Sequence, residues 1–225
     1  MREIKTVDLT KTYKVGSSII TAVDKVNFEV NEAKFVTIIG PSGSGKTTLL
    51  NLIGLNDHPT SGKIFIDNVD SSLLPNRERR KIRLLRMGFV FQAFNLLPTL
   101  NAIENVELPM ALVGKPQKEQ REKAVKLLET VGLEKRLYHR PKELSMGEMQ
   151  RVAIARAFAN DPEIIIADEP TGELDSKTAQ EIISLLFDIN RKEKTAVIVA
   201  THDEKIVKLA DTIYTIQDGK LRLEG

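Results

Sequence analysis

The chain has 225 residues, enough for one large domain or for a compact domain with an insertion. Its 33 basic and 31 acidic residues leave a net charge of +2, and aromatic residues make up only 5% with no Trp, which argues against a nucleic-acid surface and a base-stacking platform. The absence of Cys excludes disulfides and Cys-based zinc sites and fits a reducing compartment.

Hydrophobic periodicity predicts a chain in which strands and helices alternate. Alternating residues indicate strands at 4–13 and 22–30, and "KFVTIIG" at 34–40 indicates a buried strand. Further strands are predicted at 61–68, 87–91, 163–168 and 195–201, and helices at 44–55, 76–86, 118–137 and 176–192. This order favours an α/β core with a parallel sheet covered on both faces, interrupted after Gln92 by a mostly helical segment.

The segment "GPSGSGKTT" matches the phosphate-binding pattern G-x-x-x-x-G-K-[ST] between a predicted strand and a predicted helix. Its residues are Gly40, Pro41, Ser42, Gly43, Ser44, Gly45, Lys46, Thr47 and Thr48. The glycines let backbone N–H groups point at phosphate oxygens, and the helix adds its positive N-terminal end. We expect Lys46 to bind the β- and γ-phosphates and Thr47 to bind Mg²⁺; the alternative is an ordinary glycine-rich turn.

The buried strand "IIIAD" ends in two adjacent carboxylates, Asp168 and Glu169. Unpaired charge at such a place is costly, and a nearby Mg²⁺ would account for it. Asp168 would then hold the ion through water, and Glu169 would orient and polarise an attacking water. The alternative is that both carboxylates only cap the exposed end of the strand.

Gln92 and His202 each follow a predicted strand, so they are expected at the same carboxyl edge of the sheet as Lys46 and Glu169. Gln92 could there reach both the metal and the water. Taken singly, Tyr13, Gln92 and His202 are weak signals, since each residue type is more often structural or simply exposed.

In this motif order, essentially the whole chain resembles the nucleotide-binding subunit of an ABC transporter. Tyr13 matches the aromatic residue that stacks on adenine, and residues 40–48 match the Walker A loop. Gln92 matches the Q-loop, "ELSMGEMQ" the signature segment, "IIIADE" the Walker B strand, "GELD" at 172–175 the D-loop and His202 the switch histidine. "ENVELPM" at 104–110 and "HRPKELS" at 139–145 resemble the branch linked to lipoprotein release, macrolide export and cell division.

This resemblance implies a P-loop NTPase core with a mostly parallel sheet, an N-terminal antiparallel β part and an inserted helical subdomain. One ABC-type ATPase domain would span 1–225, with the α/β core at 1–92 and 161–225 and the helical subdomain at 93–160. Two copies of the chain, or this chain and a related cassette, would close around two Mg-ATP, and each site would be completed in trans by Ser145, Gly147, Glu148 and Asp175. Glu169, His202 and Gln92 would be the catalytic residues, and Thr47, Gln92 and Asp168 the metal ligands.

The signature segment departs from the usual Leu-Ser-Gly-Gly-Gln, with Met146 in place of glycine and Glu148 in place of glutamine. Ser145 and Glu148 form the pattern S-x-x-E, which predicts a capping box that turns the Glu148 carboxylate back to the Ser145 N–H. Met146 would then be the first helical residue, where glycine is not required. We therefore expect an altered but functional segment; a degenerate site is the alternative.

The resemblance also implies an integral membrane permease as partner and a peripheral position at the cytoplasmic face of the cell membrane. The start of the chain lacks the apolar core of a signal peptide, no apolar run approaches the ~20 residues of a membrane span, and no appended regulatory domain is expected after residue 225. The partner is expected near "AFNLLPTL" at 93–100, where Phe94, Leu96, Leu97 and Leu100 form an apolar cluster, unless these residues pack within their own subdomain.

Two other classes of protein share parts of this motif set. An ABC-type ATPase acting on DNA or ribosomes would be expected to carry a long coiled coil or a second cassette, and the sequence has neither. A small-molecule kinase would share the P-loop but would not explain the signature helix or the pair Glu169 and His202. Hydrolysis of ATP without an added acceptor would distinguish the kinase.

Overall fold

The computed structural model describes residues 3–224, which form two sheets. The larger sheet has the strand order β11-β10-β4-β9-β8-β7 and is parallel except for β11 at one edge. Its strands are β4 (Phe35–Ile39), β7 (Met87–Phe91), β8 (Ile164–Asp168), β9 (Ala196–Ala200), β10 (Thr212–Gln217) and β11 (Lys220–Leu223).

The smaller sheet is antiparallel and is built from the first part of the chain. Its strands are β1 (Glu3–Val15), β2 (Ser18–Val26), β3 (Glu29–Asn31), β5 (Ser61–Ile66) and β6 (Val69–Asp70). The expected mostly parallel sheet and N-terminal antiparallel part are therefore both confirmed.

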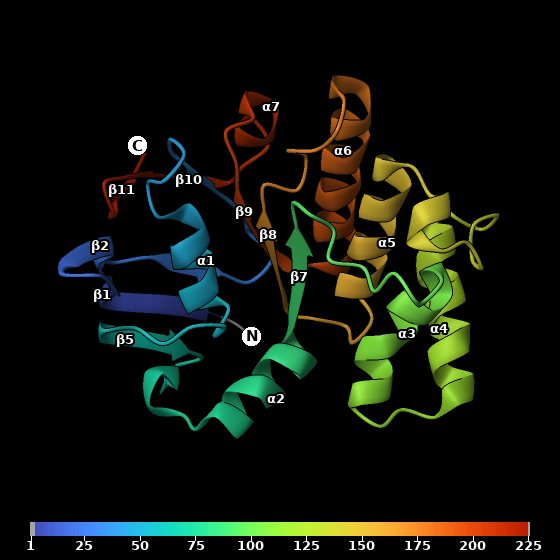
Figure 1. The fold of residues 1–225 in the computed structure, drawn as a ribbon, viewed down its shortest axis with the longest axis horizontal. Coiled ribbons are helices and arrows are strands. Elements are labelled where there is room, and N and C mark those ends of the chain that lie inside the picture. The colour runs from blue at the N-terminus through green and yellow to red at the C-terminus, as the bar shows by residue number, and fades with distance from the viewer. Residues whose placement is uncertain (1–2, 225) are drawn as a thin grey trace.

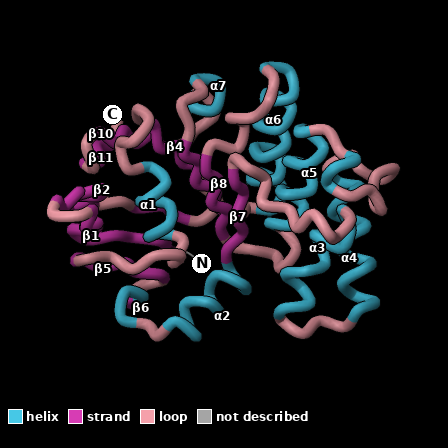
Figure 2. Tube along the Cα trace, viewed as in Figure 1, coloured by secondary structure: helices cyan, strands magenta, loops and turns pink. Residues whose placement is uncertain are grey.

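The helices lie between the sheets and on the far face of the parallel sheet (Figure 1). α1 (Lys46–Ile53) contacts β1 and β2 on one side and β8 and β9 on the other. α2 (Asn76–Arg86) leads directly into β7, and the short helices η1 (Ser71–Leu73) and α7 (Glu204–Val207) lie in connections. In Figure 2 the remaining helices gather on one side of the strands. They are α3 (Ala102–Leu112), α4 (Gln117–Thr130), η2 (Pro141–Glu143), α5 (Met146–Ala157) and α6 (Ser176–Glu193).

The parallel sheet separates two hydrophobic cores, because successive side chains of a strand point to opposite faces. Ile164 and Ile166 of β8 belong to the core shared with α1 and the antiparallel sheet. Ile165 and Ala167 belong to the core shared with α3 to α6. A strand buried on both faces must be apolar throughout, which explains the unbroken apolar runs in the sequence.

Most predicted elements lie where they were expected, and α2 and β7 have the predicted bounds. The helix predicted at 118–137 is shorter than expected. It ends at Thr130, Val131 caps it, and Gly132 follows with a left-handed φ of +76°. Glycine is the usual residue just past a helix end, so this stop could have been predicted. Among the described residues, no helix combines the length and the hydropathy needed to cross a bilayer.

Candidate active site

The loop between β4 and α1 owes its shape to glycines. Gly43 and Gly45 have φ values of +77° and +109°, in the region that other residues adopt only at a cost. A Cβ atom on Gly45 would lie 2.2 Å from the carbonyl oxygen of Ala22. Glycine is therefore required at 45, and the turn starts α1 at Lys46 with the helix N-terminus facing the loop.

This loop forms one wall of a cleft of about 610 Å³ at the carboxyl edge of the parallel strands. The cleft is lined by Ala22, Gly40, Pro41, Ser42, Gly43, Gly45, Lys46, Thr47, Thr48, Gln92, Glu169, Gly172 and His202. Of the residues expected to contact phosphate or water, Gln92, Glu169 and His202 thus share the cleft with Lys46. Ala22 was not predicted, because no local pattern marks it, and Gly172 belongs to the "GELD" segment but was not predicted to line the cleft.

Three charged or titratable side chains converge in the cleft. The Glu169 carboxylate lies 3.6 Å from Lys46 Nζ and 2.8 Å from His202 Nδ1. Lys46 also donates to the carbonyl oxygens of Gly40 and Pro41 at 2.8 and 3.1 Å. Lys46 is buried whereas the His202 side chain is 75% exposed. The arrangement holds Glu169 next to the phosphate loop with one side open to solvent.

Glu169 has an unusual backbone conformation, with φ of +46°. Its N–H donates to the Ala200 carbonyl oxygen at 2.9 Å, so a neighbouring strand holds this conformation in place. A left-handed φ costs a non-glycine residue on the order of 1–3 kcal/mol, and such residues cluster at functional sites.

Asp168 and Thr47 are the residues best suited to hold a magnesium ion. The pKa of Asp168 is raised, mainly because the carboxyl group is buried and also because of the nearby charge of Glu169. A hydrogen bond with Thr47 and the charge of Lys46 act in the opposite direction. Asp168 Oδ1 and Ser44 Oγ are buried without a hydrogen-bond partner within the described chain, which fits oxygen atoms that serve a ligand. Among the described residues, no group of three His, Cys, Asp or Glu is arranged so that it could hold a metal ion, so an ion here would keep several waters, as Mg²⁺ prefers.

Gln92 was expected to reach both the metal and the water. Its side chain is exposed, and Nε2 donates to Glu173 Oε1 at 3.0 Å. A Cβ atom on Gly172 would lie 3.0 Å from the same Nε2, so the segment after β8 packs on this amide.

Tyr13 lies on β1 and does not line the cleft itself. Its ring is 39% exposed, and its hydroxyl donates to Asp57 Oδ2 at 3.0 Å. Burial and this hydrogen bond raise the pKa of the Tyr13 phenol, while a hydrogen bond with Thr48 acts the other way. Tyr13 is thereby placed next to the last residue of the phosphate loop.

The predicted capping box begins α5. Ser145 Oγ accepts from the Glu148 N–H at 3.2 Å, and Glu148 Oε2 accepts from the Ser145 N–H at 2.9 Å. Arg136 Nε donates to Glu148 Oε1 at 2.8 Å, and this bond, followed by the one from Ser145, lowers the pKa of Glu148. Met146 is the first helical residue and is 51% exposed, so it fills no gap within the chain.

Gly147 and Asp175 both lie against Thr178 of α6. A Cβ atom on Gly147 would lie 2.5 Å from Thr178 Cγ2, so a side chain at 147 would force α5 and α6 apart. Asp175 caps α6 by accepting from the N–H groups of Lys177 and Thr178, and its Oδ2 accepts from the Thr178 hydroxyl at 2.6 Å.

The start of α5 lies outside the cleft. None of Ser145, Gly147, Glu148 and Asp175 is among the residues that line the cleft. One hydrogen bond that was not predicted links α5 to the cleft. Gln150 of α5 is fully buried and donates to the Pro170 carbonyl oxygen, next to Glu169.

Comparison with known proteins gives a consistent result. Residues 23–172 match the family model described as ABC transporter. The chain is 51% identical to an uncharacterised ABC transporter ATP-binding protein of Thermotoga maritima, over 97% of this chain and 92% of the relative. It is 43% identical to the lipoprotein-releasing system ATP-binding protein LolD of Hyphomonas neptunium, over 97% and 96%.

A solved structure is also similar. The dimeric, post-hydrolysis ATP-binding cassette MJ0796 of Methanocaldococcus jannaschii, bound to ADP and Pi, superimposes with a TM-score of 0.92 at 46% identity, covering 98% of this chain and 97% of that one. The family model alone matches more than half of the chain, and the fold agrees with it throughout. The chain belongs to the ABC transporter family, as one of its ATP-binding proteins.

Proposed function

We propose that this protein binds and hydrolyses ATP as the motor subunit of an ABC transporter. The observation that carries the proposal is the Glu169 carboxylate, which lies between Lys46 of the phosphate loop and His202. A carboxylate in this position can orient a water for in-line attack on a γ-phosphate bound by the loop. The similar cassette that was solved with ADP and Pi bound supports the same reaction.

In the mechanism, the backbone N–H groups of residues 40–48 and the Lys46 ammonium bind the phosphates, and Tyr13 stacks on the adenine. Glu169 accepts a hydrogen bond from the attacking water and polarises it. His202, bonded through Nδ1 to the same carboxylate, fixes its orientation and contacts the γ-phosphate. Gln92, which also lines the cleft, would help to orient the water. Thr47, Asp168 and Gln92 would hold Mg²⁺, which neutralises phosphate charge when bound.

A second copy of the chain completes each site. Ser145, Gly147, Glu148 and Asp175 lie outside the cleft of their own chain. In a head-to-tail dimer the Ser145 hydroxyl and the N-terminus of α5 would bind the partner's γ-phosphate. Loss of that phosphate on hydrolysis then removes the contact and opens the dimer.

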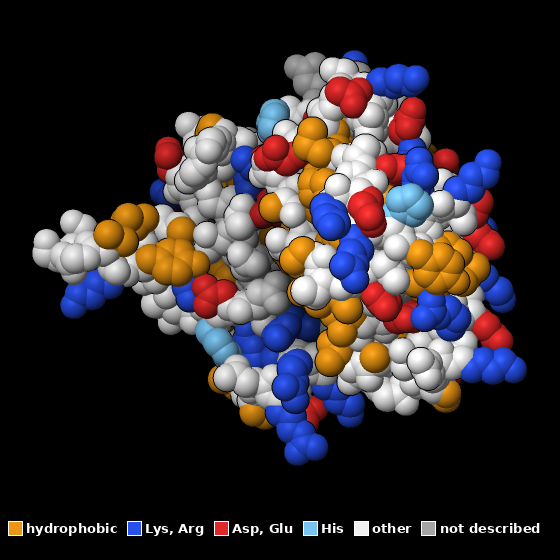
Figure 3. Space-filling model, turned by 45° about the vertical axis from the view of Figure 1, so that its right-hand side comes forward, with side chains coloured by type: hydrophobic (Ala, Val, Ile, Leu, Met, Phe, Trp, Pro, Cys, Tyr) orange, Lys and Arg blue, Asp and Glu red, His pale blue; other side chains and the backbone are white. Residues whose placement is uncertain are grey.

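The motion would pass to a membrane permease through a groove between the α/β core and the helices at 93–160. This groove has a volume of about 340 Å³, and its lining includes Arg80, Arg83, Phe89, Phe91 and Arg156. Figure 3 shows Lys and Arg side chains gathered low on this face, next to apolar ones. Such a lining suits a cytoplasmic segment with apolar and acidic side chains.

The apolar segment 93–100 borders this groove. Arg156 donates to the carbonyl oxygens of Phe94 and Asn95, which holds the segment in place. Leu96 packs on the helical core, whereas Leu97 is 44% exposed. We assign Leu97 rather than Leu96 to contact with the permease, at the cytoplasmic face of the membrane.

The cellular task would belong to the branch for lipoprotein release, macrolide or peptide efflux, or mechanical transmission. The similarity to LolD supports this branch. Substrate selection would lie in the permease, since the cleft accounts for nucleotide chemistry alone.

The test is the oligomeric state and activity of Glu169→Gln. With Mg-ATP, size-exclusion chromatography with light scattering should show a dimer that reverts to a monomer without nucleotide, while hydrolysis falls on the order of a hundredfold or more. Normal hydrolysis by Glu169→Gln would refute the assigned role of Glu169. A monomer under all conditions would refute closure by the chain alone.

A further inference from the structure

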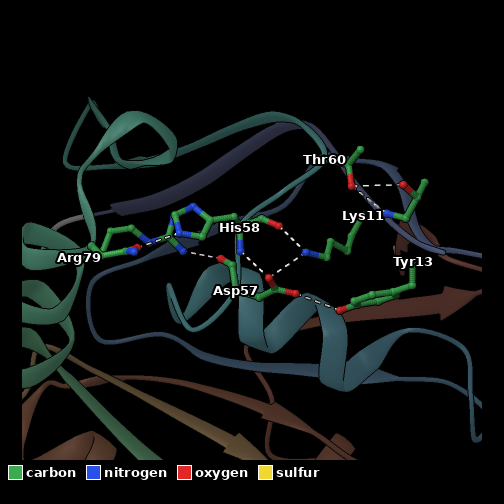
Figure 4. Close-up of polar contacts among 8 residues, drawn as sticks. Lys11, Tyr13, Asp57, His58, Thr60 and Arg79 are labelled. Atoms are coloured by element: carbon green, nitrogen blue, oxygen red, sulfur yellow. Dashed lines mark hydrogen bonds and ion pairs between the residues drawn. The ribbon is translucent and has the colours of Figure 1, made fainter. Parts of the chain in front are cut away.

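Tyr13 is attached to a residue far away in the sequence. Its hydroxyl donates to Asp57, which follows α1 and lies 44 positions along the chain (Figure 4). The ring is thereby tied to the segment that follows α1, the helix that carries the phosphate loop.

Asp57 is itself held from three directions. Lys11 Nζ donates to Asp57 Oδ1 and to the His58 carbonyl oxygen, each at 2.7 Å. The His58 N–H donates to the same Oδ1 at 2.6 Å. The guanidinium of Arg79, 1% exposed and contributed by α2, donates to the Asp57 carbonyl oxygen. Both carboxylate oxygens and the backbone of Asp57 are therefore fixed before a nucleotide arrives.

The charge of Asp57 is preserved in this setting. Burial acts to raise its pKa, but the hydrogen bonds from Lys11, His58 and Tyr13 outweigh burial and lower it. Asp57 is thus ionised at neutral pH, and an ionised acceptor makes the stronger hydrogen bond to the Tyr13 phenol.

The ring of Tyr13 has little freedom left. The phenol oxygen is bound at one end, and the strand backbone fixes the other. Lys11 Nζ lies 5.1 Å from the ring centroid, a cation–π contact that occupies one face. Tyr13 is 39% exposed, which leaves surface on which a base could stack. A side chain already fixed in its binding conformation loses little entropy when a flat ligand stacks on it.

We propose that Asp57 is a positioning residue for the nucleotide base: its carboxylate, held by Lys11 and the His58 N–H, fixes the ring of Tyr13 in the stacking orientation, while Arg79 holds the Asp57 backbone. The inference rests on the proposed function, in which Tyr13 stacks on adenine. Asp57 does not contact the nucleotide. It increases affinity for the base and leaves affinity for the phosphates unchanged.

The test compares ADP with inorganic pyrophosphate, because both contain two linked phosphates but only ADP has a base. Dissociation constants are measured by calorimetry with Mg²⁺ for the unchanged protein, Asp57→Ala, Tyr13→Phe and the double variant. Each single exchange removes the same hydrogen bond from one side, so each should weaken ADP binding about three- to tenfold. The double variant should bind ADP no more weakly than the weaker single variant, and pyrophosphate binding should not change.

Two further variants make the outcomes distinct. Asp70→Ala removes another carboxylate of the antiparallel sheet, away from the cleft, and should bind ADP normally. If Tyr13→Ala weakens ADP binding while Asp57→Ala and Tyr13→Phe do not, the positioning role is refuted and the stacking role stands. If Tyr13→Ala binds ADP normally, both are refuted. An equal loss of pyrophosphate binding in Asp57→Ala would also refute the inference, because the exchange would then act through the phosphate loop.

Discussion

The nucleotide cleft and the start of α5 differ in how complete they are within one chain. In the cleft, Glu169 contacts both Lys46 of the phosphate loop and His202, and Lys46 and Glu169 are largely buried. At α5, Ser145 and Glu148 satisfy each other's backbone N–H groups, while Met146 and Ser145 face solvent. A site assembled inside one chain can bind on its own, whereas an exposed and self-capped helix end contributes only when another molecule covers it.

The exchange Ser145→Ala should have the largest effect, and it distinguishes the role of the start of α5 from the role of the cleft. It removes the hydroxyl that we assign to the partner's γ-phosphate, so the ATP-dependent dimer of the Glu169→Gln protein should be lost, while the monomer should bind ADP as before. Light scattering and calorimetry measure the two effects. Loss of the cap should also cost about 1 kcal/mol of unfolding free energy.

Asn101→Ala is the matched control for Ser145→Ala, because Asn101 and Glu104 form the same capping box at the start of α3. It should lose a similar amount of stability and still dimerise. If it also fails to dimerise, stability rather than the Ser145 hydroxyl explains the loss.

A second change tests the packing beneath the signature segment. Gly147→Ala places a methyl group against Thr178 Cγ2 and should lower the unfolding free energy by about 1–3 kcal/mol and weaken the dimer. Thr178→Ser removes that methyl group and keeps the hydroxyl that bonds Asp175. Chemical denaturation should therefore show partial recovery in the double variant; no recovery would mean that the loss has another origin.

Met146→Gly tests whether the unusual signature segment is impaired. Because Met146 is exposed and has an ordinary helical position, the exchange should change the rate of ATP hydrolysis less than tenfold. A rise of tenfold or more in a phosphate-release assay would show that Met146 weakens the site. Met146→Ala is the control, because it removes the side chain without adding a glycine. Glycine destabilises a helix by about 1 kcal/mol relative to alanine.

The smallest expected effect concerns pH. The pKa of Glu148 is lowered in the folded state, so its ion pair with Arg136 stabilises the protein above the unfolded-state pKa and is lost as the pH falls through the folded-state pKa. Glu148→Gln keeps the cap but removes this charge. The difference in melting temperature between the two proteins should shrink below about pH 5. Arg136→Gln should show the same trend, and a pH-independent difference would exclude the ion pair as its cause.

Much of the fold could be predicted because its signals are local. Apolar runs gave the strands of the parallel sheet, and the spacing of Ser145 and Glu148 gave the capping box. The predicted edge of the sheet brought Gln92, Glu169 and His202 to one cleft.

Contacts between distant segments could not be predicted. Tyr13 and Asp57, or Gln150 and Pro170, meet only after the sheets and helices have packed, and neither pair has a spacing that marks it. The helix predicted at 76–86 contains Arg79, and its sequence does not show that Arg79 is the largest fully buried side chain of the described residues. The backbone of Asp57 accepts its hydrogen bond, and that acceptor lies outside the helix.

The left-handed backbone at Glu169 has a consequence for protein engineering. Glycine adopts φ of +46° without strain, so replacing Glu169 by glycine would relieve part of the stored cost while deleting the group that orients water. A directed-evolution campaign that selects only for heat resistance would therefore favour an inactive protein at this position. Any thermostable version of this motor must gain its stability elsewhere and keep the strained glutamate.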